Sequence, residues 1–163
     1  MGDSRAYIIR KEQIRLATKD QSLVQQLVDV GQISEAEAET HMFRNVILQA
    51  LGAQSEVAPA TGRLHLRRGD IILLCSDGLS GKLRAEDIQN IVVSNSANLA
   101  VACDELIAEA NNRGGEDNIT VVLARVDGDD LDEPTTDRIT IELPALEEDK
   151  TLEDTFEPDT EPH

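Results

Sequence analysis

The sequence predicts an α+β domain followed by an acidic tail. Residues 71–75 and 119–124 are almost continuously apolar, as strands buried on both faces are. Two longer regions, residues 22–52 and 84–115, repeat apolar side chains at helical spacing and contain glycines where helices would end. From residue 127 onward no such periodicity remains, and the acidic, threonine- and proline-containing composition is typical of a disordered segment.

The N-terminal part predicts a β-hairpin and then helices. Residues 6–10 and 13–18 are expected to form two strands joined by Lys11 and Glu12, and the turn type stays open because neither is glycine. Asp20 or Ser22 is expected to cap a helix that Gly31 ends.

A second helix is predicted to begin after Ser34. Glu37 follows three residues later, which is the pattern of a capping box. The stretch "RNVILQALG", residues 44–52, is expected to continue as helix until Gly52.

The second half predicts alternating strands and helices. The buried strand 71–75 is followed by helices at residues 84–94 and 97–113, and the last strand covers residues 118–126. Gly114 and Gly115 break the longer helix. Its inner face is expected to consist of Leu99, Cys103, Leu106, Ile107 and Ala110.

Composition excludes several classes of function. The tail carries fifteen Asp and Glu against Arg138 and Lys150, so it holds −13 of the net charge of −17. No basic patch or aromatic platform indicates nucleic-acid binding. No apolar stretch could span a bilayer and no signal-peptide pattern is present, so we expect no membrane association and a cytoplasmic location, with Cys75 and Cys103 as reduced thiols.

Three aspartates stand at predicted strand ends, each close to glycine. Asp77 follows the strand 71–75, Asp117 precedes the last strand, and Asp3 precedes the hairpin. Singly, each is more often a turn residue than a ligand. Together, carboxylates at one sheet edge would repel one another or recruit a hard cation such as Mg²⁺ or Mn²⁺. Both interpretations stay open at this point, and no histidine–cysteine spacing indicates zinc.

Four ordered blocks, "GDSRAY", "RNVILQALG", "DIILLCSDGLS" and "GGEDNITVVLARV", resemble the bacterial form of the metal-dependent serine/threonine phosphatases of type 2C, the PPM family. The resemblance covers residues 2–126. It implies an α-β-β-α sandwich of two antiparallel sheets flanked by helices, here incomplete. Residues 1–126 would be the C-terminal part of that domain, and residues 127–163 a disordered acidic tail.

The resemblance also implies a mechanism and a ligand set. In this family a two-metal centre of Mg²⁺ or Mn²⁺ activates a water that attacks the phosphorus of phosphoserine or phosphothreonine in proteins, without a separate catalytic residue. Asp77 and Asp117 match ligands of one metal, and Asp3 matches a residue that helps Asp77 to hold a third ion. His41 and Arg44, expected in a helix near the family's flap, would shape the substrate site.

The sequence departs from the family pattern at its N-terminal side. The phosphate-gripping arginine, the "NED" glutamate and the "DGxGG" segment have no counterpart in these residues. We therefore expect a C-terminal portion without activity of its own. The alternative is a non-catalytic, phosphatase-like binding or regulatory module. Expected partners are phosphoprotein substrates, a cognate serine/threonine kinase and, through the tail threonines, a phosphothreonine-binding domain.

Overall fold

A computed structural model of the chain describes residues 2–44, 46–50, 52, 56–135 and 138–142. Pairs of strands are separated by groups of two or three helices. In chain order they are β1 (Arg5–Arg10), β2 (Gln13–Leu16), α1 (Leu23–Asp29), α2 (Glu35–Thr40), β3 (Arg63–Leu64), β4 (Ile71–Cys75), α3 (Asp77–Ser80), α4 (Ala85–Ser94), α5 (Leu99–Asn112), β5 (Val121–Arg125) and β6 (Ile141–Glu142). No helix within the described ranges is both long and apolar enough to cross a bilayer.

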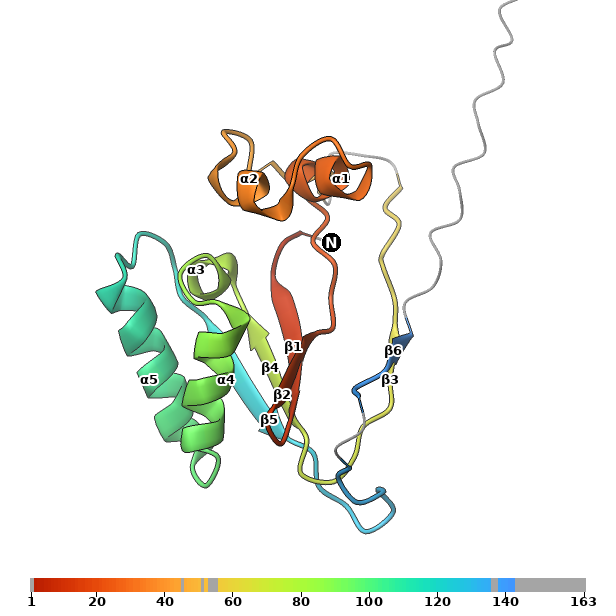
Figure 1. Cartoon of the computed structure of the whole chain (residues 1–163), viewed down its shortest axis with the longest axis vertical. Helices are drawn as coiled ribbons and strands as arrows, with labels where there is room; N and C mark the ends of the chain where they lie inside the picture. The colour runs from red at the N-terminus through yellow and green to blue at the C-terminus, as the bar shows by residue number, and fades with distance from the viewer. Residues whose placement is uncertain (1, 45, 51, 53–55, 136–137, 143–163) are drawn as a thin grey trace, which may run out of the picture.

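The main sheet is antiparallel throughout, with strand order β2-β1-β4-β5. A second, two-stranded sheet pairs β3 with β6. Figure 1 shows α4 and α5 on one side of the main sheet and the β3–β6 ribbon on the other. The predicted α+β class, an incomplete sandwich of antiparallel sheets flanked by helices, is confirmed.

The hydrophobic core lies between the main sheet and the helices that follow β4. Leu73 from β4, Leu79 from α3 and Leu106 from α5 are completely buried in it. Of the predicted inner face of α5, Leu106 and Ala110 are fully buried, while the other three are only partly so. Both cysteines are free thiols, as expected.

The expectation that the apolar strands are buried on both faces is wrong. Leu74 and Val122 are paired in register, and their side chains are 49% and 51% exposed. Side chains alternate between the two faces of a strand, and the helices cover only the face that carries Leu73. A continuous apolar run in the sequence is therefore compatible with a strand that has one exposed face, as β4 and β5 have within the described part of the chain.

The first two helices form where their caps predict them. The Ser22 hydroxyl accepts a hydrogen bond from the Gln25 amide, which makes Ser22 the cap of α1. Ser34 and Glu37 form the predicted capping box of α2. In the hairpin, Lys11 adopts φ of 52°, so a non-glycine residue accommodates the tight turn.

The helix predicted over residues 44–52 is not formed by the described residues 46–50. Their backbone instead bonds to the chain at the start of α1: Leu23 donates to the Val46 carbonyl and Leu48 donates to the Gln21 carbonyl. These tertiary hydrogen bonds compete with the intrahelical ones that the apolar spacing favours. Residues 45 and 51 lie outside the described part of the chain.

The boundary at residue 126 stays a prediction, but the described residues that follow it are not a free tail. Ile139 is buried, and the strand β6 within "RITIEL" pairs with β3. The Arg68 amide also donates to the Asp132 carbonyl. Composition did not indicate that these residues form structure, because a short segment with few apolar side chains can pair with an existing strand. Residues 143–163 lie outside the described ranges.

A buried ion pair joins β1 to the start of β4. Arg10 donates from Nε to Asp70 Oδ1 and from Nη2 to Asp70 Oδ2, both at 2.8 Å. The two side chains are 4% and 0% exposed. Arg10 also donates to the His65 carbonyl, and Asp70 accepts from the Arg67 amide. These additional bonds satisfy groups that would be costly to leave buried and unpaired.

We predict that Asp70→Asn lowers the free energy of unfolding by about 3 to 5 kcal/mol, because it leaves the Arg10 charge buried without its counter-ion. Urea denaturation measures this change. Asp29→Asn is the control, since the Lys19–Asp29 pair is 39% and 37% exposed, and such pairs contribute about 1 kcal/mol or less. Equal losses in the two variants would contradict the prediction.

Candidate metal centre

The strand register brings Asp3 and Asp77 to one edge of the main sheet. Arg5 is paired with Cys75 at the end of the antiparallel β1–β4 ladder. Asp3 lies two residues before Arg5 and Asp77 two residues after Cys75, so both aspartates leave the sheet at the same place. The pKa of the Asp3 carboxyl is raised, first by its partial burial and then by the negative charge of Asp77.

A serine joins the Asp77 segment to the Asp117 segment. The Ser76 hydroxyl donates to the Asn118 carbonyl at 2.9 Å and accepts from the Thr120 amide at 3.0 Å. The Ser76 amide donates in turn to the Thr120 carbonyl at 3.1 Å. One residue therefore holds the loop that contains Asp117 against the end of β4.

Gly78 permits this close approach. A Cβ atom at position 78 would lie 2.5 Å from the Asn118 carbonyl oxygen, which is inside the van der Waals contact distance. The glycine after Asp77 is thus required by packing against the opposite loop. Its backbone amide donates to Asp77 Oδ1 at 3.0 Å, and the Asn118 amide donates to Asp117 Oδ1 at 2.7 Å.

The three candidate ligands lie at the edge of the sheet and not in the core. Asp77 and Asp117 are exposed, and Asp3 is only partly buried. The short helix α3, which the sequence analysis missed, begins at Asp77 and turns it outward. Within the described residues, no group of three or more His, Cys, Asp or Glu side chains is close enough together to hold a metal ion.

The donor chemistry at this edge fits a hard divalent cation. Asp3, Asp77 and Asp117 offer carboxylate oxygens, and Mg²⁺ and Mn²⁺ prefer such ligands. The pKa of Asp3 is raised first by partial burial and then by the negative charge of Asp77, so the two carboxylates repel each other. A cation would relieve this repulsion. The assignment of these three residues as ligands stays a prediction.

Sequence reasoning missed Asp20 as a residue of this edge. Its carboxylate accepts hydrogen bonds from Arg5 Nε at 3.2 and 3.1 Å and from Arg5 Nη2 at 2.7 Å. The side chains of Arg5 and Asp20 are 31% and 12% exposed, so the pair is partly shielded from solvent. The only sequence signal was an acid shortly before a helix, which suggested a cap instead.

His41 and Arg44 lie in the turn after α2, not in the expected helix. The His41 ring accepts from the Phe43 amide through Nδ1 at 3.2 Å, and the two rings lie 5.7 Å apart. Arg44 is exposed. Figure 1 shows α1 and α2 beyond the sheet edge at which β1 begins and β4 ends.

Comparison with known families decides the assignment. The sequence model of the family "Stage II sporulation protein E (SpoIIE)" matches residues 17–127. The chain belongs to the SpoIIE family. The resemblance to bacterial type 2C phosphatases is also confirmed by curated relatives that are named protein phosphatase or serine/threonine phosphatase.

Two of these relatives and two solved structures define the extent of the likeness. Protein phosphatase PhpP of Streptococcus pneumoniae is 41% identical over 81% of this chain and 53% of its own length. Serine/threonine phosphatase stp of Listeria monocytogenes is 39% identical over 78% of this chain and 50% of its own. The chain spans about half the length of these curated relatives.

The structural matches agree with this extent. The phosphatase PstP/Ppp of Mycobacterium tuberculosis superposes with a TM-score of 0.71 at 41% identity, over 78% of this chain and 53% of that one. The catalytic domain of PstP in complex with two manganese ions gives a TM-score of 0.65 at 40% identity, over 78% and 52% of the two chains. The SpoIIE-family core of the present chain thus shares its fold with about half of each phosphatase.

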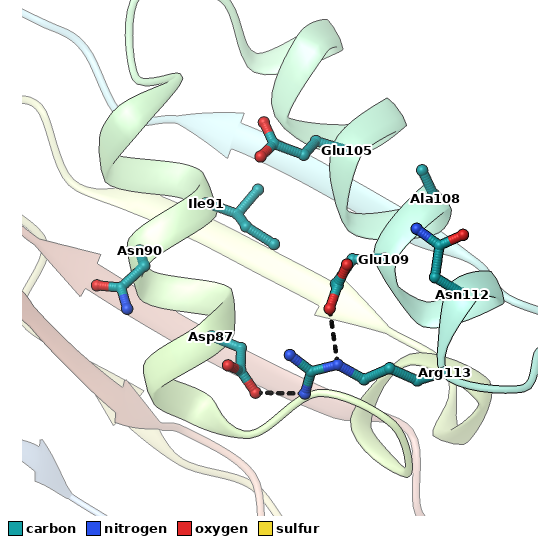
Figure 2. A pocket seen from close by; sticks show the side chains of 8 residues that line it. All are labelled: Asp87, Asn90, Ile91, Glu105, Ala108, Glu109, Asn112 and Arg113. Atoms are coloured by element: carbon teal, nitrogen blue, oxygen red, sulfur yellow. Dashed lines mark hydrogen bonds and ion pairs between the residues drawn. The ribbon is translucent and has the colours of Figure 1, made fainter.

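A pocket of about 310 Å³ lies between α4 and α5, and Figure 2 shows its lining side chains. Arg113 closes one end by donating to Asp87 and Glu109, each at 2.8 Å. This bond with Arg113 is the main reason that the pKa of Asp87 is lowered. None of the three candidate ligands lines this pocket, so we interpret it as a structural contact between the two helices.

We predict that Ser76→Ala loosens the Asp117 loop, because it removes both hydroxyl hydrogen bonds. Each such bond contributes about 1 kcal/mol, so amide exchange of Thr120 is expected to accelerate about fivefold or more. Hydrogen-exchange mass spectrometry measures this rate. Ser94→Ala, at an exposed serine that ends α4, is the control. A Thr120 amide as protected as in the wild type would show that Ser76 does not hold the loop.

Proposed function

We propose that this chain contributes Asp3, Asp77 and Asp117 to the metal centre of a phosphatase that dephosphorylates phosphoserine and phosphothreonine in proteins. The observation that carries the proposal is the meeting of β1, β4 and the Asp117 loop at one sheet edge. The manganese-bound structure of PstP, which shares this fold, supports the use of a divalent cation.

The roles of the chain's own residues follow from their positions. Asp77 and Asp117, held together through Ser76, would bind one ion with carboxylate oxygens, and Asp3 with Asp77 would bind a further one. A bound Mg²⁺ or Mn²⁺ supplies an activated water and stabilises the charge that develops on phosphoryl oxygens. His41 and Arg44 would contact the substrate beside this edge.

Activity of the whole centre requires more ligands than these three residues. The described part of the chain holds no closed cluster of three metal-binding side chains, and the apolar face around Leu74 and Val122 is exposed. We infer that residues corresponding to the other half of the phosphatase relatives complete both the site and the sandwich. By itself, the 163-residue chain is then inactive.

A second function, a non-catalytic phosphatase-like binding or regulatory module, is favoured by the same exposed acids. The two functions make different demands on Asp77 and Asp117, because a binding module needs no metal ligands. For the catalytic function, the phosphatase relatives support phosphoprotein substrates. The proposal adds a cognate serine/threonine kinase as partner and a cytoplasmic location. The acidic, threonine-containing tail supports recognition by a phosphothreonine-binding domain.

We predict that a chimera in which this chain replaces the matching 132 residues of PhpP is an active phosphatase. With Mn²⁺ it should hydrolyse a phosphothreonine peptide, and Asp77→Asn or Asp117→Asn should lower kcat/KM at least about 100-fold by removing a ligand oxygen. Asp104→Asn, on the exposed side of α5, should leave the rate within about twofold.

Two outcomes would contradict this assignment. Wild-type rates in the Asp77→Asn or Asp117→Asn chimera would remove that residue from the site. A folded chimera without turnover would favour the binding module. Hydrolysis by the 163-residue chain alone would instead contradict the inference that the site is completed by other residues.

A further inference from the structure

We propose that Asp20 is a positioning residue, which through Arg5 locks the segment around α1 and α2 onto the strand end that carries Asp3. This inference deepens the proposed metal centre and rests on it for its effect on the cation. We call the contacts of Asp20 and its neighbours with the chain around Asp3 the clamp. These contacts lie within the described residues, so the clamp can be tested without any metal.

The first part of the clamp is a forked ion pair. Arg5 donates to both carboxylate oxygens of Asp20, with the shortest bond, from Nη2 to Oδ2, at 2.7 Å. A guanidinium that binds a carboxylate through two nitrogens fixes orientation as well as distance. Arg5 follows Asp3 by two residues, so this orientation is imposed directly beside the candidate ligand.

The second part is a set of backbone bonds around the same residues. The Gln21 amide donates to the Gly2 carbonyl at 3.0 Å, and the Ala6 amide donates to the Thr18 hydroxyl at 3.1 Å. These bonds fasten the chain at residues 18–21 to both sides of Asp3. Asp20 lies in the middle of the fastened stretch, where its ion pair closes the arrangement.

The third part connects residues 18–21 to the C-terminal end of the segment that contains α1 and α2. Leu23 donates to the Val46 carbonyl at 2.8 Å, Leu48 donates to the Gln21 carbonyl at 2.9 Å, and Ser22 forms an isolated bridge with Ile47. Residues 24–44 therefore leave and return at one point. That point is held against the Asp3 strand by Asp20 and Gln21.

A buried acceptor lies within this junction. Gln21 Oε1 is inaccessible to solvent and has no hydrogen-bond partner among the described residues. The burial of this atom shows that the junction is closely packed.

The Lys19–Asp29 pair provides a matched comparison in the same segment. It has a single contact of 2.7 Å, and both side chains are more than a third exposed. Solvent screens such a pair and its side chains remain mobile. If Asp20 acted only as another surface charge, removal of either aspartate would have the same effect.

Hydrogen-exchange mass spectrometry on the full 163-residue chain tests the clamp. In Asp20→Asn, exchange of the Gln21 and Leu48 amides should accelerate at least about tenfold, because a charged hydrogen-bonded pair is lost. Exchange of the Leu73 amide in the core strand should stay unchanged, which shows that the fold persists. Asp29→Asn should alter the Gln21 and Leu48 amides by less than about threefold, and Asp20→Glu, which keeps the charge, should restore most of the protection.

The effect on the cation is measured in the PhpP chimera. Asp20→Asn should raise the Mn²⁺ concentration for half-maximal rate about tenfold, as loss of a residue that orients a ligand does, while Asp29→Asn leaves it unchanged. An inactive chimera contradicts the proposed function, and exchange in the chain alone still decides the clamp. An active chimera in which Asp20→Asn and Asp29→Asn behave alike, or equal exchange in those two variants of the chain, overturns the positioning role.

Discussion

The antiparallel register of β1, β4 and β5 is the constraint on which the candidate site depends. It pairs Arg5 with Cys75 and Cys75 with Val121, so the chain passes the same sheet edge three times. Aspartates far apart in sequence are thereby placed near one another without contacts between their side chains. A slip of one residue would move these side chains to other faces and other partners, and the apolar side chains of the strands resist such a slip.

The main sheet is covered unequally. On one face, α4 and α5 pack over Leu73 and its neighbours, whereas Leu74 and Val122 are exposed on the other. The candidate site shows the same division, since its acids are exposed and lie at an edge rather than in an enclosed cleft. Both features agree with a chain that spans about half the length of its phosphatase relatives.

Local patterns were read correctly where the deciding interactions are themselves local. The capping box at Ser34 and Glu37 and the helix stop near Gly114 depend on residues within one or two turns. The expected helix after Arg44 failed because the backbone of residues 46–48 bonds to residues 21–23. Composition did not reveal the strand β6 for a similar reason, because it is stabilised by a distant partner strand.

The sequence by itself determined which side chains supply the chemistry: three aspartates beside glycines, each at the end of an apolar strand. Only the tertiary structure decided that Ser76 joins two of their segments, that Gly78 is required by a carbonyl across the gap, and that Arg5 is bound to Asp20. The physical reason is how far apart in the sequence the interacting residues lie. Strand and helix signals arise from neighbouring residues, whereas hydrogen bonds and close contacts between separate segments exist only after the strands have paired.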